Sequence, residues 1–267
     1  MSRTVVIADL HVHWHPYYDA GCLWRTIVPR LRRFGGGSAD IVLCWTESRR
    51  CHAFDRLACG DGPWPVGQAA SGGAALWIEN SSNDDGVWIV RGQQIVTAER
   101  LEILAIGARD DGWEGQPADQ VIRAVRDVAA PALIPWAPGK WWGRRGRLLH
   151  ELIQRWPPEE LMLVDSSLRP WGWPLPRPLR PWKQRGHLLA GSDPLETPGE
   201  ERQIGRYATR LAASLDARDP VAALRTLLRD ARVTARPVGT RAGPLATAWR
   251  IVRHLRRSRL APQASDE

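Results

Sequence analysis

Three histidines within five residues are the part of this sequence best suited to chemistry. His11, His13 and His15 directly follow an apolar run near the N-terminus, and the carboxylates of Asp9 and Asp19 flank them. The apolar run predicts a buried strand, so the three imidazoles should share one face if the strand continues that far. Imidazole is the commonest metal ligand, and the two acids could orient the rings or add oxygen ligands. The pattern predicts a metal or catalytic site; the alternative is an ordinary strand whose histidines are simply hydrogen-bonded.

Composition limits the class of protein. A chain of 267 residues fits one large domain or two small ones, and a substantial core can form. The apolar runs fall well short of the ~20 residues of a membrane helix, and no apolar signal segment follows Met1, so we expect a cytoplasmic protein without a membrane span. The net charge of +8 is carried almost entirely by arginine, which reflects either genome composition or nucleic-acid binding.

Apolar segments with strand and helix spacing alternate along the chain. Strands are predicted at 4–8, 41–45, 75–78, 87–90, 95–96, 101–106, 132–134, 161–164 and 187–190, and a loop is predicted at 60–73. Helices are predicted at 23–31, 121–128, 148–156, 204–215, 221–228 and 245–260, with the first kinked or split by Pro29. This alternation predicts a mostly parallel sheet, open or closed, with helices outside.

Polar residues follow several of these strands. In α/β folds, working residues gather at the carboxyl ends of the strands, so these positions are expected to form one site. No internal boundary is visible in the sequence, and we expect a single domain over residues 1–260 followed by a disordered tail at 261–267.

A second candidate cluster lies between a predicted strand and a predicted helix. Lys140, one of only two lysines in the chain, stands between a Pro-Gly turn and two tryptophans. Together with Arg144 and Arg145 it could bind a phosphate, sulfate or carboxylate near a helix start. An ordinary loop with its indoles packed against the rim of the fold explains the segment equally well.

The segment from Asp9 to His13, Asp-Leu-His-Val-His, resembles the first motif of the polymerase and histidinol phosphatase (PHP) family. The Gly-Ser-Asp that ends at Asp193 resembles the start of the last motif, and the likeness covers residues 4 to 215. The resemblance implies a distorted seven-stranded β/α barrel with divalent metals at the carboxyl ends of its strands, usually hydrolysing phosphate esters. Carried over to this chain, it implies that His11, His13, Asp19 and Asp193 bind metal.

Other positions depart from the PHP pattern. The family's Thr-Asp-His reads Thr46-Glu47-Ser48 here, its Gly-x-Glu reads Gly92-Gln93-Gln94, and its closing Asp-x-His reads Asp193-Pro194-Leu195. A histidine near Glu102 and the histidine of the His-Pro motif, here Ala137, are also missing. We therefore expect one or two metal ions, since a catalytic site needs about three protein ligands. Additional ligands could come from His15, Glu47, His52, Glu102 and Asp165.

The favoured function is that of a metal-dependent hydrolase, a phosphoesterase acting on an anionic small molecule. A Zn, Mn or Mg ion would lower the pKa of a bound water, to roughly 7 in the case of zinc. Asp9, His15, Glu102 and Lys140 are the catalytic candidates, and Lys140, Arg144 and Arg145 are the substrate-binding candidates. One alternative is a catalytically inactive PHP-fold protein that binds a phosphorylated ligand or a partner. Another is nucleic-acid binding or processing, which would show a steep salt dependence.

Overall fold

A single mixed sheet forms the core of the protein. The computed structural model describes residues 5–36, 39–81 and 85–260, so the tail predicted to be disordered and residue 4 lie outside it. Within the described residues the sheet has 11 strands, and its main path runs β11-β10-β1-β2-β5-β6-β7-β8-β9. In chain order, the strands of this path are β1 (Val6–Val12), β2 (Asp40–Glu47), β5 (Gly86–Val96), β6 (Glu102–Ile106), β7 (Ala132–Pro135), β8 (Leu161–Ser166), β9 (Leu189–Gly191), β10 (Tyr207–Leu211) and β11 (Ala235–Gly239).

The two ends of this path approach each other, which gives the sheet its nearly closed, barrel-like form. The amide of Leu188, just before β9, donates to the carbonyl of Ala235 in β11 over 2.9 Å. Strand β9 also contacts β1 and β10. The predicted α/β barrel is therefore confirmed.

The sheet is less parallel than the sequence suggested. The pairs β1–β2, β2–β5, β7–β8 and β8–β9 are parallel, but β5–β6, β6–β7, β1–β10 and β10–β11 are antiparallel. The strands β3 (Val66–Ala70) and β4 (Ala75–Glu79) form a hairpin on the side of β5. The expectation of a mostly parallel sheet is thus wrong: β5 and β6 are joined by a short hairpin connection, while the antiparallel pairs β6–β7 and β10–β11 are joined by longer connections that contain helices.

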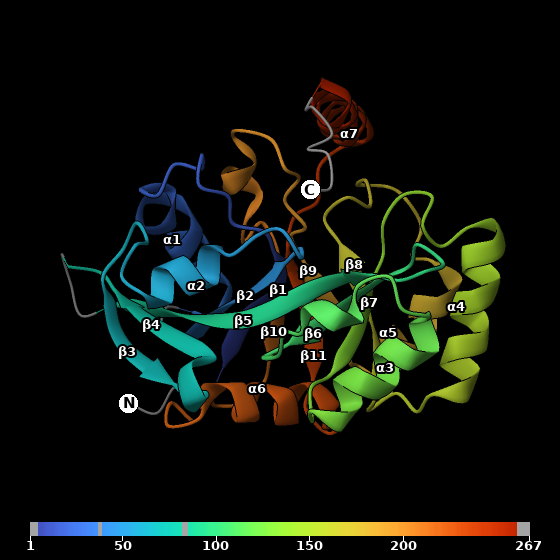
Figure 1. Cartoon of the computed structure of the whole chain (residues 1–267), viewed down its shortest axis with the longest axis horizontal. Coiled ribbons are helices and arrows are strands. Elements are labelled where there is room, and N and C mark those ends of the chain that lie inside the picture. The colour runs from blue at the N-terminus through green and yellow to red at the C-terminus, as the bar shows by residue number, and fades with distance from the viewer. Residues whose placement is uncertain (1–4, 37–38, 82–84, 261–267) are drawn as a thin grey trace.

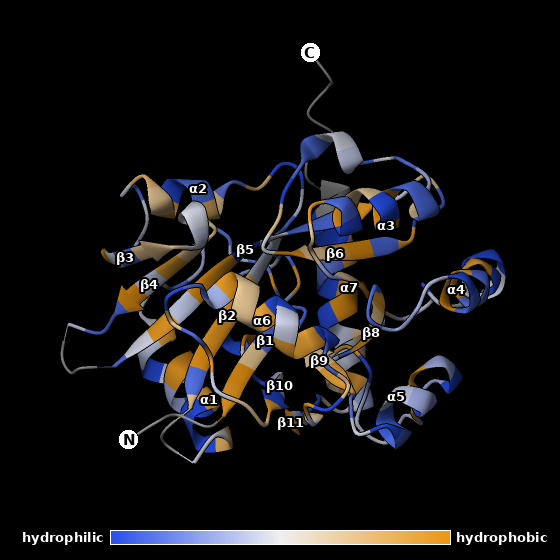
Figure 2. Cartoon of the chain, turned by 90° about the horizontal axis from the view of Figure 1, so that it is seen from below, coloured by the Kyte–Doolittle hydropathy of each residue, from blue (hydrophilic) through white to orange (hydrophobic). Residues whose placement is uncertain are grey.

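Helices cover the outside and one end of the barrel. Figure 1 shows α1 (Val28–Phe34) and α2 (Ala53–Ala58) on one flank, and α3 (Ala118–Asp127), α4 (Gly143–Arg155) and α5 (Arg180–Gln184) on the other. Figure 2 shows apolar residues along the strands and polar residues on the outer helices. Pro29 stands in the first turn of α1, and a π-helical turn at Leu23–Ile27 leads directly into that helix, so the run expected to be kinked or split by Pro29 instead changes its helix type there.

The two ends of the barrel are closed differently. Val221 and Leu224 of α6 (Pro220–Arg229) pack against the inward-facing apolar residues of the strands. Near the other end, α7 (Pro244–Leu260) stands apart from the sheet at the top of Figure 1. Among the described residues, no helix combines the length and apolar character that crossing a membrane requires.

Two segments differ from the expected elements. Residues 204–215, expected to be helical, contain strand β10, in which Tyr207, Thr209 and Leu211 alternate with Ala208 and Arg210. Apolar residues at both period-two and period-four spacing made this short run ambiguous. Part of the loop expected at 60–73 is strand β3, which is mostly exposed and so lacks an apolar pattern.

Candidate metal centre

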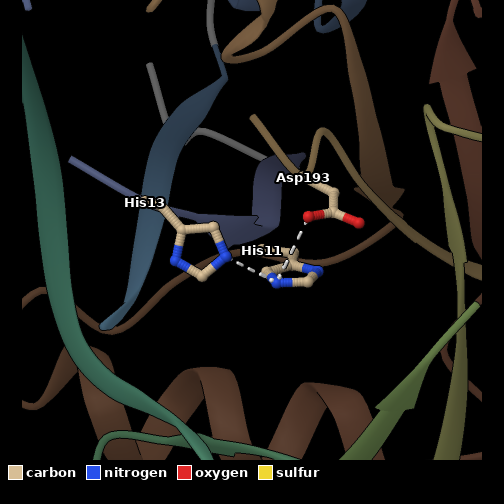
Figure 3. A group of neighbouring side chains, drawn as sticks. All are labelled: His11, His13 and Asp193. Carbon is tan, nitrogen blue, oxygen red and sulfur yellow. Dashed lines mark hydrogen bonds and ion pairs between the residues drawn. The ribbon is translucent and has the colours of Figure 1, made fainter. Parts of the chain in front are cut away.

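Three of the residues predicted to bind metal converge at one end of the barrel. His11 lies in β1, His13 directly after it, and Asp193 two residues after β9. One ligand atom from each lies within 4.8 Å of the others. His11 Nε2 is 3.0 Å from His13 Nε2 and 3.7 Å from Asp193 Oδ1 (Figure 3). Ligands at tetrahedral zinc, with Zn–N near 2.05 Å, are about 3.3 Å apart. The two separations from His11 Nε2 lie on either side of that value, and this is the spacing expected if the side chains share one divalent cation.

Close backbone approach brings Asp193 to the histidines. Its amide donates to the carbonyl of His11 over 2.9 Å, and its φ of 48° is in the left-handed region. Gly191 makes this approach possible, because a Cβ at that position would stand 2.7 Å from His11 Cβ. Ser166 Oγ donates to Asp193 Oδ2 over 3.1 Å and fixes the carboxylate. The geometry of the cluster is therefore set by the packing of β9 beside β1.

The protonation states suit metal binding. Burial, followed by the neighbouring His11, lowers the pKa of His13 to about 3, so its imidazole is neutral near pH 7. Burial acts to raise the pKa of Asp193, but the attraction of His11, His13 and Lys140 outweighs it and lowers that pKa. A neutral imidazole and an ionised carboxylate are the forms in which these side chains bind a metal.

Two further residues lie next to the cluster: Gln94, from the segment that replaces Gly-x-Glu, and Asp9, from the first motif. Gln94 Oε1 is 2.7 Å from His11 Nε2, which makes it a potential fourth ligand. Asp9, predicted to act in catalysis or to orient the rings, instead accepts backbone amides of Ser192 and Gly205, each over 2.8 Å. Burial raises the pKa of Asp9 to about 6. Its position indicates that it holds β1 to the segments that follow β9.

A cavity of about 400 Å³ opens beside the cluster and contains the predicted anion-binding lysine. Lys140 and Glu102 form an ion pair there, and both line the cavity together with His13 and Asp193. Burial lowers the pKa of Lys140 from its usual value. The lysine therefore lies where an anion bound near the cluster would meet it.

The two arginines predicted to assist Lys140 are used differently. Arg145 donates to the carbonyls of Gly139 over 2.9 Å and Arg100 over 3.3 Å, so it supports the loop that carries the lysine. Arg144 is exposed at the start of α4 and lies outside the residues that line the cavity. Of the predicted anion cradle, the structure brings only Lys140 to the cavity.

Two other predicted site residues lie away from the cluster. Asp19 is exposed, pairs with Arg25 and accepts the amide of Gly21 over 3.0 Å. His15 stacks on Tyr17 with ring centroids 5.2 Å apart and lines a different cavity. Strand β1 ends at Val12 after an irregularity in its pairing with β2, so the three histidines do not share one face of a continuing strand.

The C-terminal helix covers the cavity, a role that the sequence did not reveal. Ile251, His254 and Leu255 of α7 line it. Arg250 forms a buried ion pair with Glu200 at 2.7 Å, and it donates to the carbonyl of Asp193 over 3.4 Å. The local spacing of residues in this helix carries no signal that Arg250 is buried.

The comparisons with known proteins concern the overall arrangement. No family model and no curated protein matches the chain. A two-domain protein from Bacteroides vulgatus, described as containing a predicted PHP-like metal-dependent phosphoesterase, is 15% identical, with a TM-score of 0.46, over 87% of this chain and 65% of its own. The lesion-specific endonuclease EndoQ from Pyrococcus furiosus is 13% identical, with a TM-score of 0.43, over 84% and 56%. PsfC from Pseudomonas syringae is 12% identical, with a TM-score of 0.47, over 96% and 99%.

The chain resembles PHP-like proteins. The chain spans less than two thirds of the length of the Bacteroides and Pyrococcus proteins. Identities and TM-scores this low do not indicate the function of the chain.

Three of the residues expected as additional metal ligands have other roles in the structure. Glu47 is buried, lies 3.3 Å from Arg109 and accepts the amide of Phe54 over 2.9 Å, and burial raises its pKa to about 7. Asp165 accepts Arg169 Nε over 2.7 Å and the hydroxyl of Tyr207 over 2.7 Å. These carboxylates, expected as additional ligands, are engaged in buried networks of their own. His52, another expected ligand, is exposed, and its Nδ1 lies 3.5 Å from a carboxylate oxygen of Asp55.

Proposed function

We propose that this chain is a metal-dependent hydrolase of phosphate esters that holds one divalent cation between His11, His13 and Asp193. The convergence of these three side chains from the first and the ninth strands supports the proposal most directly. Two imidazoles and a carboxylate suit Zn²⁺ or Mn²⁺. Gln94, which replaces a carboxylate of the PHP pattern, contributes a neutral oxygen, and this favours one cation over two.

Four residues that line the cavity also have a role in this proposal. A bound divalent cation would activate a water molecule and offset charge on the phosphoryl group. Lys140 binds a phosphate oxygen and adds positive charge opposite the cluster. Glu102 positions Lys140 through their ion pair, and the carboxylate of Asp193 opposes the lowering of the lysine pKa by burial. Leu255 and Ile251 of α7 exclude bulk water from the cavity.

Metal analysis and turnover test the proposal together. The purified protein should contain about one equivalent of metal per chain, and His11→Ala and Asp193→Ala should lose it. Hydrolysis of p-nitrophenyl phosphate should fall by at least about 100-fold in both variants, and by less in Lys140→Ala, mainly through KM. Arg185→Ala, a substitution of an exposed residue that does not line the cavity, serves as the control. Unchanged metal content in both ligand variants would refute the assignment.

A second candidate function is ligand binding without turnover. The observation that favours it is the replacement of PHP-pattern ligands by Ser48 and Gln94, which leaves fewer metal ligands than the family pattern provides. This candidate predicts that phosphate esters stabilise the protein against thermal unfolding while remaining intact. Metal-dependent release of phosphate, lost in Asp193→Ala, would exclude it.

A further inference from the structure

A larger cavity adjoins the candidate metal centre. Its volume is about 710 Å³, and Glu196 lines both this cavity and the one that contains Lys140. Arg49, Arg50 and Arg56 all line it, and all three are exposed. A molecule bound at the metal centre and extending past Glu196 would therefore enter a space bordered by three guanidinium groups.

The loop that carries two of these arginines is held in place by a nearly buried side chain. Arg109, whose side chain is 8% exposed, donates to the carbonyls of Cys51 over 2.7 Å and Arg49 over 2.9 Å. The same guanidinium is 3.3 Å from Glu47 at the end of β2. Arg49 and Arg50 therefore project from a backbone that is fixed to the sheet, which lowers the entropy lost when a ligand binds.

The charge balance of the cavity favours an anion. Two carboxylates, Glu114 and Glu196, also line it, but the three arginines outnumber them. Glu114 is partly engaged, since its Oε2 accepts the amide of Val96 over 3.2 Å. Guanidinium groups bind phosphate oxygens through paired hydrogen bonds, and this geometry suits a phosphate better than a single point charge does.

The cavity also continues away from the metal centre. Arg56, Pro16 and Ala53 line both it and a third cavity of about 280 Å³, whose wall includes Trp14 and Tyr18. The three cavities thus follow one another from the metal centre to an aromatic-lined end. Such a series accommodates an elongated ligand better than a simple monoester.

We propose that the cavity lined by Arg49, Arg50 and Arg56 is a second anion-binding subsite, which receives a second phosphate of the substrate. This inference rests on the proposed function, because the first phosphate is the one bound at the metal cluster. The second phosphate belongs either to a small bisphosphate or to the neighbouring phosphodiester of a single-stranded nucleic acid. Both sources present the same chemistry to the arginines.

Binding of non-hydrolysable phosphonates tests the subsite directly. The probes are linear alkane bisphosphonates of increasing chain length, each compared by calorimetry with the monophosphonate of the same length, on the metal-loaded protein. Because exposed ion pairs contribute modestly, we expect the best bisphosphonate to bind about tenfold more tightly than its monophosphonate. The Arg49→Ala/Arg56→Ala variant should lose this difference and retain its metal. The Arg177→Ala/Arg185→Ala variant removes the same charge from exposed positions and should keep the difference.

The outcomes separate this inference from the proposed function. Equal binding of both probes by the wild-type protein at every length, or a preference that survives in Arg49→Ala/Arg56→Ala, overturns the subsite. If the protein shows neither metal nor turnover, the hydrolase proposal fails. Monophosphonate binding to the EDTA-treated protein that depends on Arg49 and Arg56 would then still establish the anion site. A short single-stranded oligonucleotide that displaces the bisphosphonate identifies nucleic acid as the source, and failure to displace it identifies a small bisphosphate.

Discussion

Gln94 offers the sharpest test of how the cluster binds metal. Its Oε1 lies 2.7 Å from His11 Nε2, so Gln94→Glu places a carboxylate beside the cation site with almost no change in shape. Two unit charges about 4 Å apart interact by about 4 kcal/mol at an effective dielectric constant of 20, and a divalent cation doubles this. Desolvation of the carboxylate offsets much of the gain.

We therefore expect a net gain of about 1.4 to 2.8 kcal/mol, which is about 10- to 100-fold tighter metal binding. Competition between the protein and a chromogenic chelator measures the dissociation constant for Zn²⁺ or Mn²⁺. Gln184→Glu adds the same charge on the exposed face of α5 and should leave this constant unchanged. Equal or weaker metal binding by Gln94→Glu would show that Gln94 does not face a cation, and the reasoning about the cluster would fail.

Three further changes test other parts of the structure. Burial raises the pKa of Glu47 from 4.5 to about 7, so its carboxylate destabilises the fold increasingly as the pH rises from 4.5 to 7, by up to about 3 kcal/mol. In urea unfolding from pH 5 to pH 8, the free energy of unfolding should therefore decline less for Glu47→Gln than for the wild type. Gly191→Ala should cost about 1–3 kcal/mol of stability and weaken metal binding, since the new methyl group meets His11, whereas Gly243→Ala, with open space around it, should be neutral in both assays. Arg250→Met should destabilise the protein by about 3–5 kcal/mol because it leaves a buried carboxylate unpaired, and equal stability in urea would contradict the anchoring of α7.

The convergence of His11, His13 and Asp193 could be predicted because residues of these types stand at strand ends. His11 and His13 follow a clear apolar strand, and Asp193 follows a second one, so the convergence of strand ends in an α/β fold was enough to bring them together. Lys140 was found for the same reason. These inferences needed only the fold class and the order of the strands.

The errors arose where local pairing or backbone irregularity decides the outcome. Asp19 follows the histidines in sequence, but Arg25, six residues later, takes its carboxylate. His15 leaves the cluster because β1 ends at Val12, and no sequence pattern marks that end. The covering position of α7 depends on an ion pair between Arg250 and Glu200, which lie 50 residues apart, and such long-range contacts have no periodic signal.

The link between the first and ninth strands also has a consequence for how the protein is made. The hydroxyl of Ser192 lies 3.5 Å from the carbonyl of His11, across 181 residues of sequence, and α7 is added later still. Contacts of such high sequence separation form slowly, since closure of a long loop must precede them. If the proposed assignment holds, the three ligands cannot share one ion until the chain has been synthesised beyond Asp193 and β9 has packed beside β1. Metal binding would then report on the packing of these two strands.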